Sequence, residues 1–236
     1  MGIAFRVLWA ALKDYYEEMF TLVGANLVWV AAVAAAFGLP ALAGRYLAPA
    51  AGLGLAVVLG FLVLPPITAG MLYLTNQIAH HKSIEFGMLW EGARTYAVKS
   101  WLLTLLNLLA GVIIATNFIF YGQFEGQWPV IVRGLFVGMG VLWCLIQIYV
   151  FPMLLEQQEP RLMLALRNAA FLTFASPITT LILAVLMIVV AVLSIGLTLP
   201  FAVAMAAVLC LMANEAVLAL LIHFKIRKPP EEDAAV

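Results

Sequence analysis

The stretch FAVAMAAVLCLMANEAVLALLIHF, residues 201–224, decides the fold class of this chain. It is long enough to cross a bilayer, because a spanning helix needs about 20 mostly apolar residues. Asn214 and Glu215 stand in its middle, where a charged and unpaired carboxylate costs about 2.5–3.5 kcal/mol. The stretch therefore predicts a membrane-spanning helix whose polar centre has to find partners.

The rest of the chain has the same character. Of its 236 residues, 66% are hydrophobic and 10% are charged, whereas a soluble domain carries roughly 25% charged residues. The loop between the fifth and sixth spans is only TLPF, which predicts a tight hairpin. We predict an all-α integral membrane six-helix bundle, with the first five spans at about 19–43, 51–76, 100–121, 130–155 and 177–199.

The distribution of Lys and Arg predicts the orientation. All of them except Arg45 and Arg133 fall on the side of the N-terminus, and basic loops stay in the cytoplasm. We therefore expect one transmembrane domain, 1–224, in the plasma or inner membrane with both termini cytoplasmic, followed by a disordered tail, 225–236. We expect no cleaved signal peptide, because IAFRVLWAAL is followed by KDYYEE and not by small residues.

Two segments of the chain resemble each other at a constant spacing. LWAALKDYYEEMFTLVGANL (8–27) and LWEGARTYAVKSWLLTLLNL (89–108) share Trp, Tyr, Asn and a basic position, and LMLALRNAAFLTFASPITTL (162–181) follows more weakly. We predict three units, about 1–77, 78–157 and 158–224. Each unit would be a cytoplasmic amphipathic helix followed by a transmembrane hairpin.

The first of these amphipathic helices has two distinct faces. Its polar stripe is expected to hold Arg6, Lys13, Asp14, Glu17 and Glu18, and its apolar stripe Leu8, Trp9, Leu12 and Tyr16. Such a helix lies in the membrane interface with its apolar face toward lipid. The alternative, that it only caps the bundle, stays open.

Small residues recur every fourth position in the returning spans, where they let helix backbones approach closely in lipid. We expect tight helix packing at Gly52, Ala56, Gly60, Gly134, Gly138, Ala202 and Ala206.

A polar layer is the candidate binding site. At 1.5 Å per residue its members lie roughly 10–14 Å below the cytoplasmic surface, and polar groups at such depth should face the bundle. The layer is either a proton- or substrate-binding site around Glu215 or a hydrogen-bonded staple that holds the bundle. Its members are Asn26, Thr68, Asn107, Gln147, Asn214 and Glu215.

Two adjacent prolines interrupt the second span beside this layer. Pro65 and Pro66 remove two amide donors and leave the carbonyl groups of Phe61 and Leu62 without helical partners. We expect a kink next to Thr68. Broken helices form substrate sites in some transporters, and a kinked packing helix is the alternative.

Sequence motifs give no sign of catalysis. The chain has no Walker-type loop, no HExxH and no GxSxG, and the neighbours His80 and His81 do not share a helix face. We expect no catalytic residue, no metal site and no cofactor. Zero net charge argues against nucleic acid as a partner.

Three short segments resemble the YesL family of small polytopic bacterial membrane proteins. They are NLVW (26–29), PPITAG (65–70) and IEFGMLWEGARTY (84–96), all in the first half of the chain. The resemblance implies an integral membrane protein, for some members associated with carbohydrate ABC permeases, and it supplies no catalytic residues.

These features favour a non-enzymatic accessory or scaffold subunit of a membrane complex. Its expected partners are the lipid bilayer and either another membrane protein or a second copy of the chain. The alternative is a small-solute or proton-coupled transporter that uses the polar layer around Glu215.

Overall fold

The computed structural model describes residues 2–46 and 48–227, and every regular element in them is a helix. Helices suit such an apolar chain because they satisfy the backbone hydrogen bonds internally, as lipid requires. Six helices are long and apolar enough to cross a membrane, which confirms the six predicted spans by length and composition. Of the predicted tail, residues 228–236 lie outside the described part.

A short helix precedes each of three pairs of long helices, in the order that the three predicted units require. The sequence repeat itself stays a prediction. The elements are α1 (Ile3–Glu17), α2 (Met19–Val33), the π-helical turn η1 (Ala34–Gly38), α3 (Leu39–Tyr46), α4 (Pro49–Ala79), α5 (Gly87–Thr95), α6 (Ala97–Tyr121), α7 (Trp128–Leu155), α8 (Leu162–Ala175), α9 (Pro177–Leu197), α10 (Leu199–Val203) and α11 (Met205–His223).

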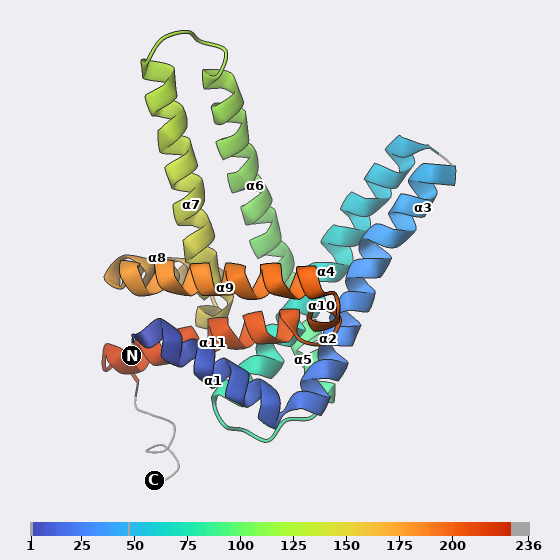
Figure 1. Cartoon of the computed structure of the whole chain (residues 1–236), viewed down its shortest axis with the longest axis vertical. Coiled ribbons are helices and arrows are strands. Elements are labelled where there is room, and N and C mark those ends of the chain that lie inside the picture. The colour runs from blue at the N-terminus through green and yellow to red at the C-terminus, as the bar shows by residue number, and fades with distance from the viewer. Residues whose placement is uncertain (1, 47, 228–236) are drawn as a thin grey trace.

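Two long hairpins, which we call the arms, rise from a common base (Figure 1). The first arm pairs the continuous run α2–η1–α3 with α4, and the second arm pairs α6 with α7. In the base, α9 and α11 run across the molecule and not along the arms. The prediction of a single six-helix bundle is therefore wrong in its arrangement. Length and hydropathy predict that a helix crosses the membrane, but not the angle at which it meets its neighbours.

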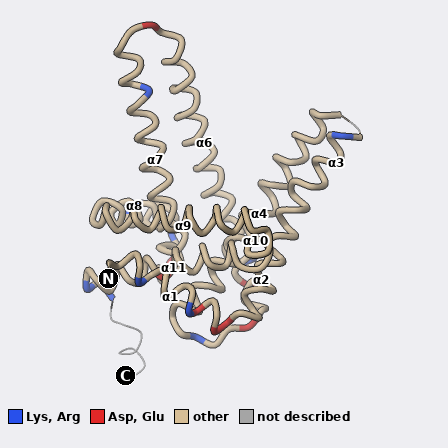
Figure 2. Tube along the Cα trace, viewed as in Figure 1, with Lys and Arg blue, Asp and Glu red and all other residues tan. Residues whose placement is uncertain are grey.

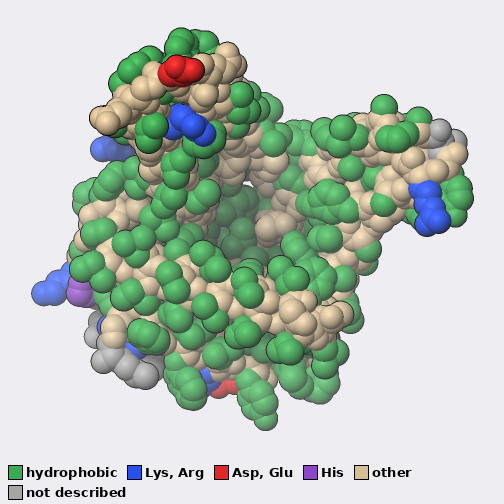
Figure 3. All heavy atoms as spheres, turned by 45° about the horizontal axis from the view of Figure 1, so that its top comes forward, with side chains coloured by type: hydrophobic (Ala, Val, Ile, Leu, Met, Phe, Trp, Pro, Cys, Tyr) green, Lys and Arg blue, Asp and Glu red, His purple; other side chains and the backbone are tan. Residues whose placement is uncertain are grey.

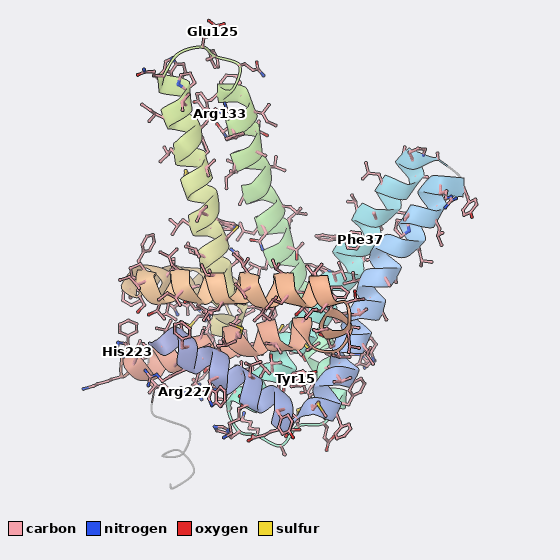
Figure 4. All side chains as sticks on the ribbon, in the orientation of Figure 1. Tyr15, Phe37, Glu125, Arg133, His223 and Arg227 are labelled. Atoms are coloured by element: carbon pink, nitrogen blue, oxygen red, sulfur yellow. The ribbon has the colours of Figure 1, made fainter. Side chains whose placement is uncertain are left out.

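Charged side chains lie at the ends of this shape (Figure 2). Arg45 is in the last turn of α3, at the tip of the first arm, and Glu125 and Arg133 lie near the tip of the second arm (Figure 4). The other described charges surround the base. Arg45 and Arg133 are thus separated from the other described basic residues, as the predicted orientation requires, while the side that is cytoplasmic stays a prediction.

The core centres on α11, which packs against α1, α2, α4, α7 and α9. Leu211, Met212 and Leu220 of this helix are fully buried. Burial of such side chains is the main stabilising contribution where the helices cross.

The two faces of α1 differ from the predicted stripes at Asp14 and at Leu8, which is half-buried and packs against the core. Trp9 and Tyr16 are 72% and 78% exposed, and Leu12 lies on the same outer face. Asp14 was expected on the exposed polar stripe, but it is only 7% exposed and belongs to the buried face with Ala4 and Ala11. The reason is tertiary: Asp14 follows Ala4, Val7 and Ala11 at helical spacing, and that face lies on α11 and α9.

The small residues of the two arms have different surroundings. A side chain added at Gly52 would meet the Gly44 Cα at 2.6 Å, so α3 and α4 approach as closely as predicted there. Gly134 and Gly138 on α7 are exposed, with no described atom within 4 Å of an added Cβ. The tight packing expected at these two glycines does not occur within residues 2–46 and 48–227.

Candidate functional site

The six residues of the expected polar layer do not meet at one point. Asn26 lies at the break between α10 and α11, Asn214 lies between α11 and α4, and Glu215 lies against α1. Thr68, Asn107 and Gln147 line a cavity between the arms.

Asn26 is a structural staple. Its Nδ2 donates to the carbonyl groups of Phe201 at 3.0 Å and Ala202 at 2.7 Å, and its Oδ1 accepts from the amides of Ala206 at 2.9 Å and Ala207 at 3.2 Å. The break between α10 and α11 leaves backbone groups without helical partners. One fully buried side chain supplies both the donor and the acceptor that these groups need.

Asn214 joins α11 to α4. Its Nδ2 donates to Thr75 Oγ1 at 2.9 Å and to the Leu72 carbonyl at 3.0 Å, and its Oδ1 accepts from Asn76 Nδ2 at 3.4 Å. Asn214 is 2% exposed, so this contact is sealed from solvent by protein. It holds two long helices in register.

Asn76 continues the contact to Glu156, which follows the end of α7. Asn76 Nδ2 donates to Glu156 Oε1 at 2.9 Å, His80 Nε2 lies 3.3 Å from the same oxygen, and Arg227 pairs with Oε2. Burial alone would raise the pKa of Glu156, but His80, Asn76 and Arg227 outweigh it and lower the pKa from its ordinary value. We call Asn76, His80, Glu156 and Arg227 the Glu156 cluster; sequence analysis missed it because its members are far apart in the chain.

Glu215 has a carboxyl neighbour and not the expected amides. Its carboxyl group lies beside that of Asp14 on α1. Burial raises the pKa of Asp14, with His81 acting in the opposite direction. Asp14 also lines a polar surface pocket of about 280 Å³ with Glu17, Glu18, His81 and Lys82.

A cavity lies between the arms, on α4, α6 and α7. Its volume is about 620 Å³, within the range of small-molecule sites, which is roughly 300–1,000 Å³. Figure 3 shows the surface hollowed between the two arms, and Phe37 points into this space (Figure 4). The lining is formed by Phe37, Ala56, Val57, Gly60, Phe61, Leu64, Pro65, Thr68, Ala69, Leu72, Ser100, Leu103, Thr104, Asn107, Leu108, Gln147 and Phe151.

Indole groups fix two of the polar side chains in this lining. Trp29 Nε1 donates to Thr68 Oγ1 at 3.1 Å, and Trp143 Nε1 donates to Asn107 Oδ1 at 3.0 Å. An indole N–H can only donate, so these bonds occupy acceptor atoms and leave the Thr68 hydroxyl hydrogen and the Asn107 Nδ2 as donors. Neither has a hydrogen-bond acceptor among the described residues.

Gln147 adds a third donor to this lining. Its Nε2 atom is buried and has no hydrogen-bond partner in the described part of the chain. A buried donor without an acceptor is costly, and native structures hold few of them. No charged side chain lines the cavity, so its walls suit apolar groups and its polar part offers donors.

Pro65 lines this cavity, Pro66 follows it, and α4 runs through both prolines without a break. The carbonyl of Leu62, which Pro66 deprives of its helical donor, accepts a hydrogen bond from Trp101 Nε1 of α6 at 3.2 Å. A tertiary donor therefore replaces the missing amide and ties α6 to α4. The kink itself stays a prediction.

Two indoles to which the sequence analysis gave no role, those of Trp29 and Trp143, thus position polar groups of the site. Trp residues next to polar residues in a span were the available signal. Within residues 2–46 and 48–227, no group of three or more His, Cys, Asp or Glu side chains is arranged to hold a metal ion.

Comparison of the chain with protein-family models, with curated proteins and with solved structures finds no match.

Proposed function

We propose that this protein is a non-enzymatic accessory or scaffold subunit of a membrane complex, and that its second arm packs against transmembrane helices of another protein. The resemblance to the YesL family makes a carbohydrate permease the first partner to test.

The observation that carries this proposal is the bare second arm. Of the described residues from Trp101 to Leu145, only Pro129 is buried. Helices associate in lipid through close van der Waals packing and interhelical hydrogen bonds, and a lone two-helix hairpin obtains little of either. A partner helix would supply the missing contacts.

The outer face of α7 fits such a partner. Gly134 and Gly138 are exposed at a spacing of four residues, and a Cβ added at either would meet no described atom within 4 Å beyond the adjoining backbone of α7. Val141 continues this face one turn further and is 53% exposed. Close backbone approach of a second helix is the usual role of this spacing in membranes.

Extraction of the protein from its native membrane with a mild polymer, followed by native mass spectrometry, tests the proposal. We expect a complex with a second protein, and we expect Gly138→Ile to dissociate it because a bulky side chain blocks the face. Gly111→Ile on α6 is the matched control, since an added Cβ there also meets nothing within 4 Å. A wild-type chain that always runs alone, or only with copies of itself, overturns the accessory role.

A second candidate is a proton-coupled transporter of a small solute, which the carboxyl pair Asp14–Glu215 favours. Proton-coupled uptake into proteoliposomes that Glu215→Gln abolishes would support it. Uptake that this substitution leaves unchanged would remove the mechanism.

A further inference from the structure

We propose that the cavity between the arms binds one membrane-dissolved amphiphile that presents a carbonyl oxygen on an apolar chain. The site does not depend on a protein partner, because the outer face of α7 and the cavity are separate surfaces.

The shape and the lining of the cavity argue for an apolar body. Its volume of about 620 Å³ exceeds a single side chain, and its wall includes the apolar side chains of Phe37, Leu64, Leu103, Leu108 and Phe151. Phe37 reaches this wall across Gly60, since its ring lies 4.0 Å from a Cβ added at that glycine. A hydrated or charged solute would lose its water there without gaining a charged partner.

The hydrogen-bonding groups argue for an acceptor on that body. Gln147 Nε2 is buried without a partner, and the indoles of Trp29 and Trp143 occupy the acceptor atoms of Thr68 and Asn107. The polar part of the lining is therefore rich in donors that lack an acceptor. A carbonyl oxygen has two lone pairs and no charge, so it satisfies these donors without the penalty of burying an ion.

Two other polar residues of the lining do not compete for the ligand. Ser100 Oγ donates to the Ala97 carbonyl at 2.7 Å, and Thr104 Oγ1 donates to the Ser100 carbonyl at 2.9 Å. Both hydroxyl hydrogens are thus used within α6. Gln147, Asn107 and Thr68 remain as the groups that can donate to the carbonyl.

The test uses the full chain in lipid nanodiscs with two probes. Decylubiquinone carries quinone carbonyls on an apolar chain, and dibrominated phosphatidylcholine carries ester carbonyls on two chains and is supplied as the nanodisc lipid. Both quench tryptophan fluorescence at short range, and native mass spectrometry counts the molecules retained. Saturable binding of one molecule of either probe supports the proposal. Binding of decylubiquinone would identify the ligand as a free amphiphile, and binding of the brominated phosphatidylcholine would identify it as a diacyl lipid of the membrane.

Variants separate this site from general partition into lipid. We expect Gln147→Leu to weaken binding about tenfold, the equivalent of one lost hydrogen bond of about 1.4 kcal/mol. Asn117→Leu, also an amide-to-leucine change but outside the cavity on α6, should bind as the wild type does. If Gln147→Leu does not fold, Asn107→Leu and the cavity-filling Gly60→Phe replace it. Absence of saturable binding with both probes, or unchanged binding in the folded cavity variants, overturns the proposal.

Discussion

The indole Nε1 of Trp101 donates a hydrogen bond, 3.2 Å long, to the carbonyl of Leu62. Pro66 has removed the amide that would otherwise bond this carbonyl within α4. One side chain of α6 thereby completes the backbone hydrogen bonding of α4. The placement of the second arm on the first therefore depends in part on a proline.

This relationship predicts a coupled pair of substitutions. Trp101→Phe should lower the free energy of unfolding by about 1 kcal/mol, because the Leu62 carbonyl loses its donor. In a Pro66→Ala background the same change should cost less of that hydrogen-bond energy, since residue 66 regains an amide. A double-mutant cycle of unfolding in mild detergent measures the difference. Equal costs in both backgrounds would show that the indole stabilises the protein in another way.

Asn26 should be the most sensitive of the six polar residues. Asn26→Leu leaves four backbone groups at the α10–α11 break without a partner, and we expect a loss of about 2–4 kcal/mol. Thermal unfolding followed by circular dichroism measures it. Asn117→Leu is the control, because Asn117 only bonds the Ile113 carbonyl of its own helix. Similar melting temperatures for both variants would show that Asn26 does not stabilise the break between α10 and α11.

The Glu156 cluster predicts acid sensitivity. Because the pKa of Glu156 is lowered on folding, its contribution to stability is present above the unfolded value of about 4.5 and is lost as pH falls through the lowered value. The wild type should therefore melt higher than Glu156→Gln at neutral pH. This difference in melting temperature should persist down to about pH 4.5 and then disappear as the pH falls further. A gap that is the same at all pH values, or absent at pH 7, would contradict the assignment.

Asp14 predicts the opposite dependence. Burial raises its pKa, so the folded state loses stability relative to the unfolded state as pH rises above the ordinary value of 3.8. Asp14→Asn keeps a hydrogen-bonding group beside Glu215 and removes the charge. We expect this variant to melt higher than the wild type at pH 7, with a smaller gain near pH 4. The exposed Glu17→Gln on the same helix should change little, and a destabilised Asp14→Asn at pH 7 would refute the carboxyl pair.

Hydrophobic runs alone predict where the six long helices lie, because length and polarity determine whether a segment suits lipid. Pro66 predicts the freed carbonyl at Leu62, because a proline has no amide hydrogen to donate. The splayed arms were not predictable in this way, since the crossing of α11 with α4 and α7 depends on side-chain packing between distant segments. Gly134 and Gly138 illustrate the same gap: their spacing predicts a close contact, but it does not say whether the second helix belongs to this chain.

The polar layer shows how far depth counting reaches. Counting residues placed Thr68, Asn107 and Gln147 at one level, and they do line one cavity. Residue counting could not separate Asn26 and Glu215 from these three residues, because the depth of a residue along a helix does not say on which side of the helix it lies. Asn76 and Glu156 went unnoticed for a related reason: each is an ordinary polar residue near a helix end, and only the fold brings them together.

The most direct test of the accessory role is residue-specific photo-crosslinking in intact native membranes. A benzophenone amino acid placed at Val141, on the open face of α7, should give one discrete product with a second protein. The same group at Ile188 on α9, which is also exposed, is the control and should give no protein product. A discrete heteromeric product from Val141 alone is the result that this account predicts. Crosslinks from Val141 to lipid only, or to a second copy of the chain only, would contradict it.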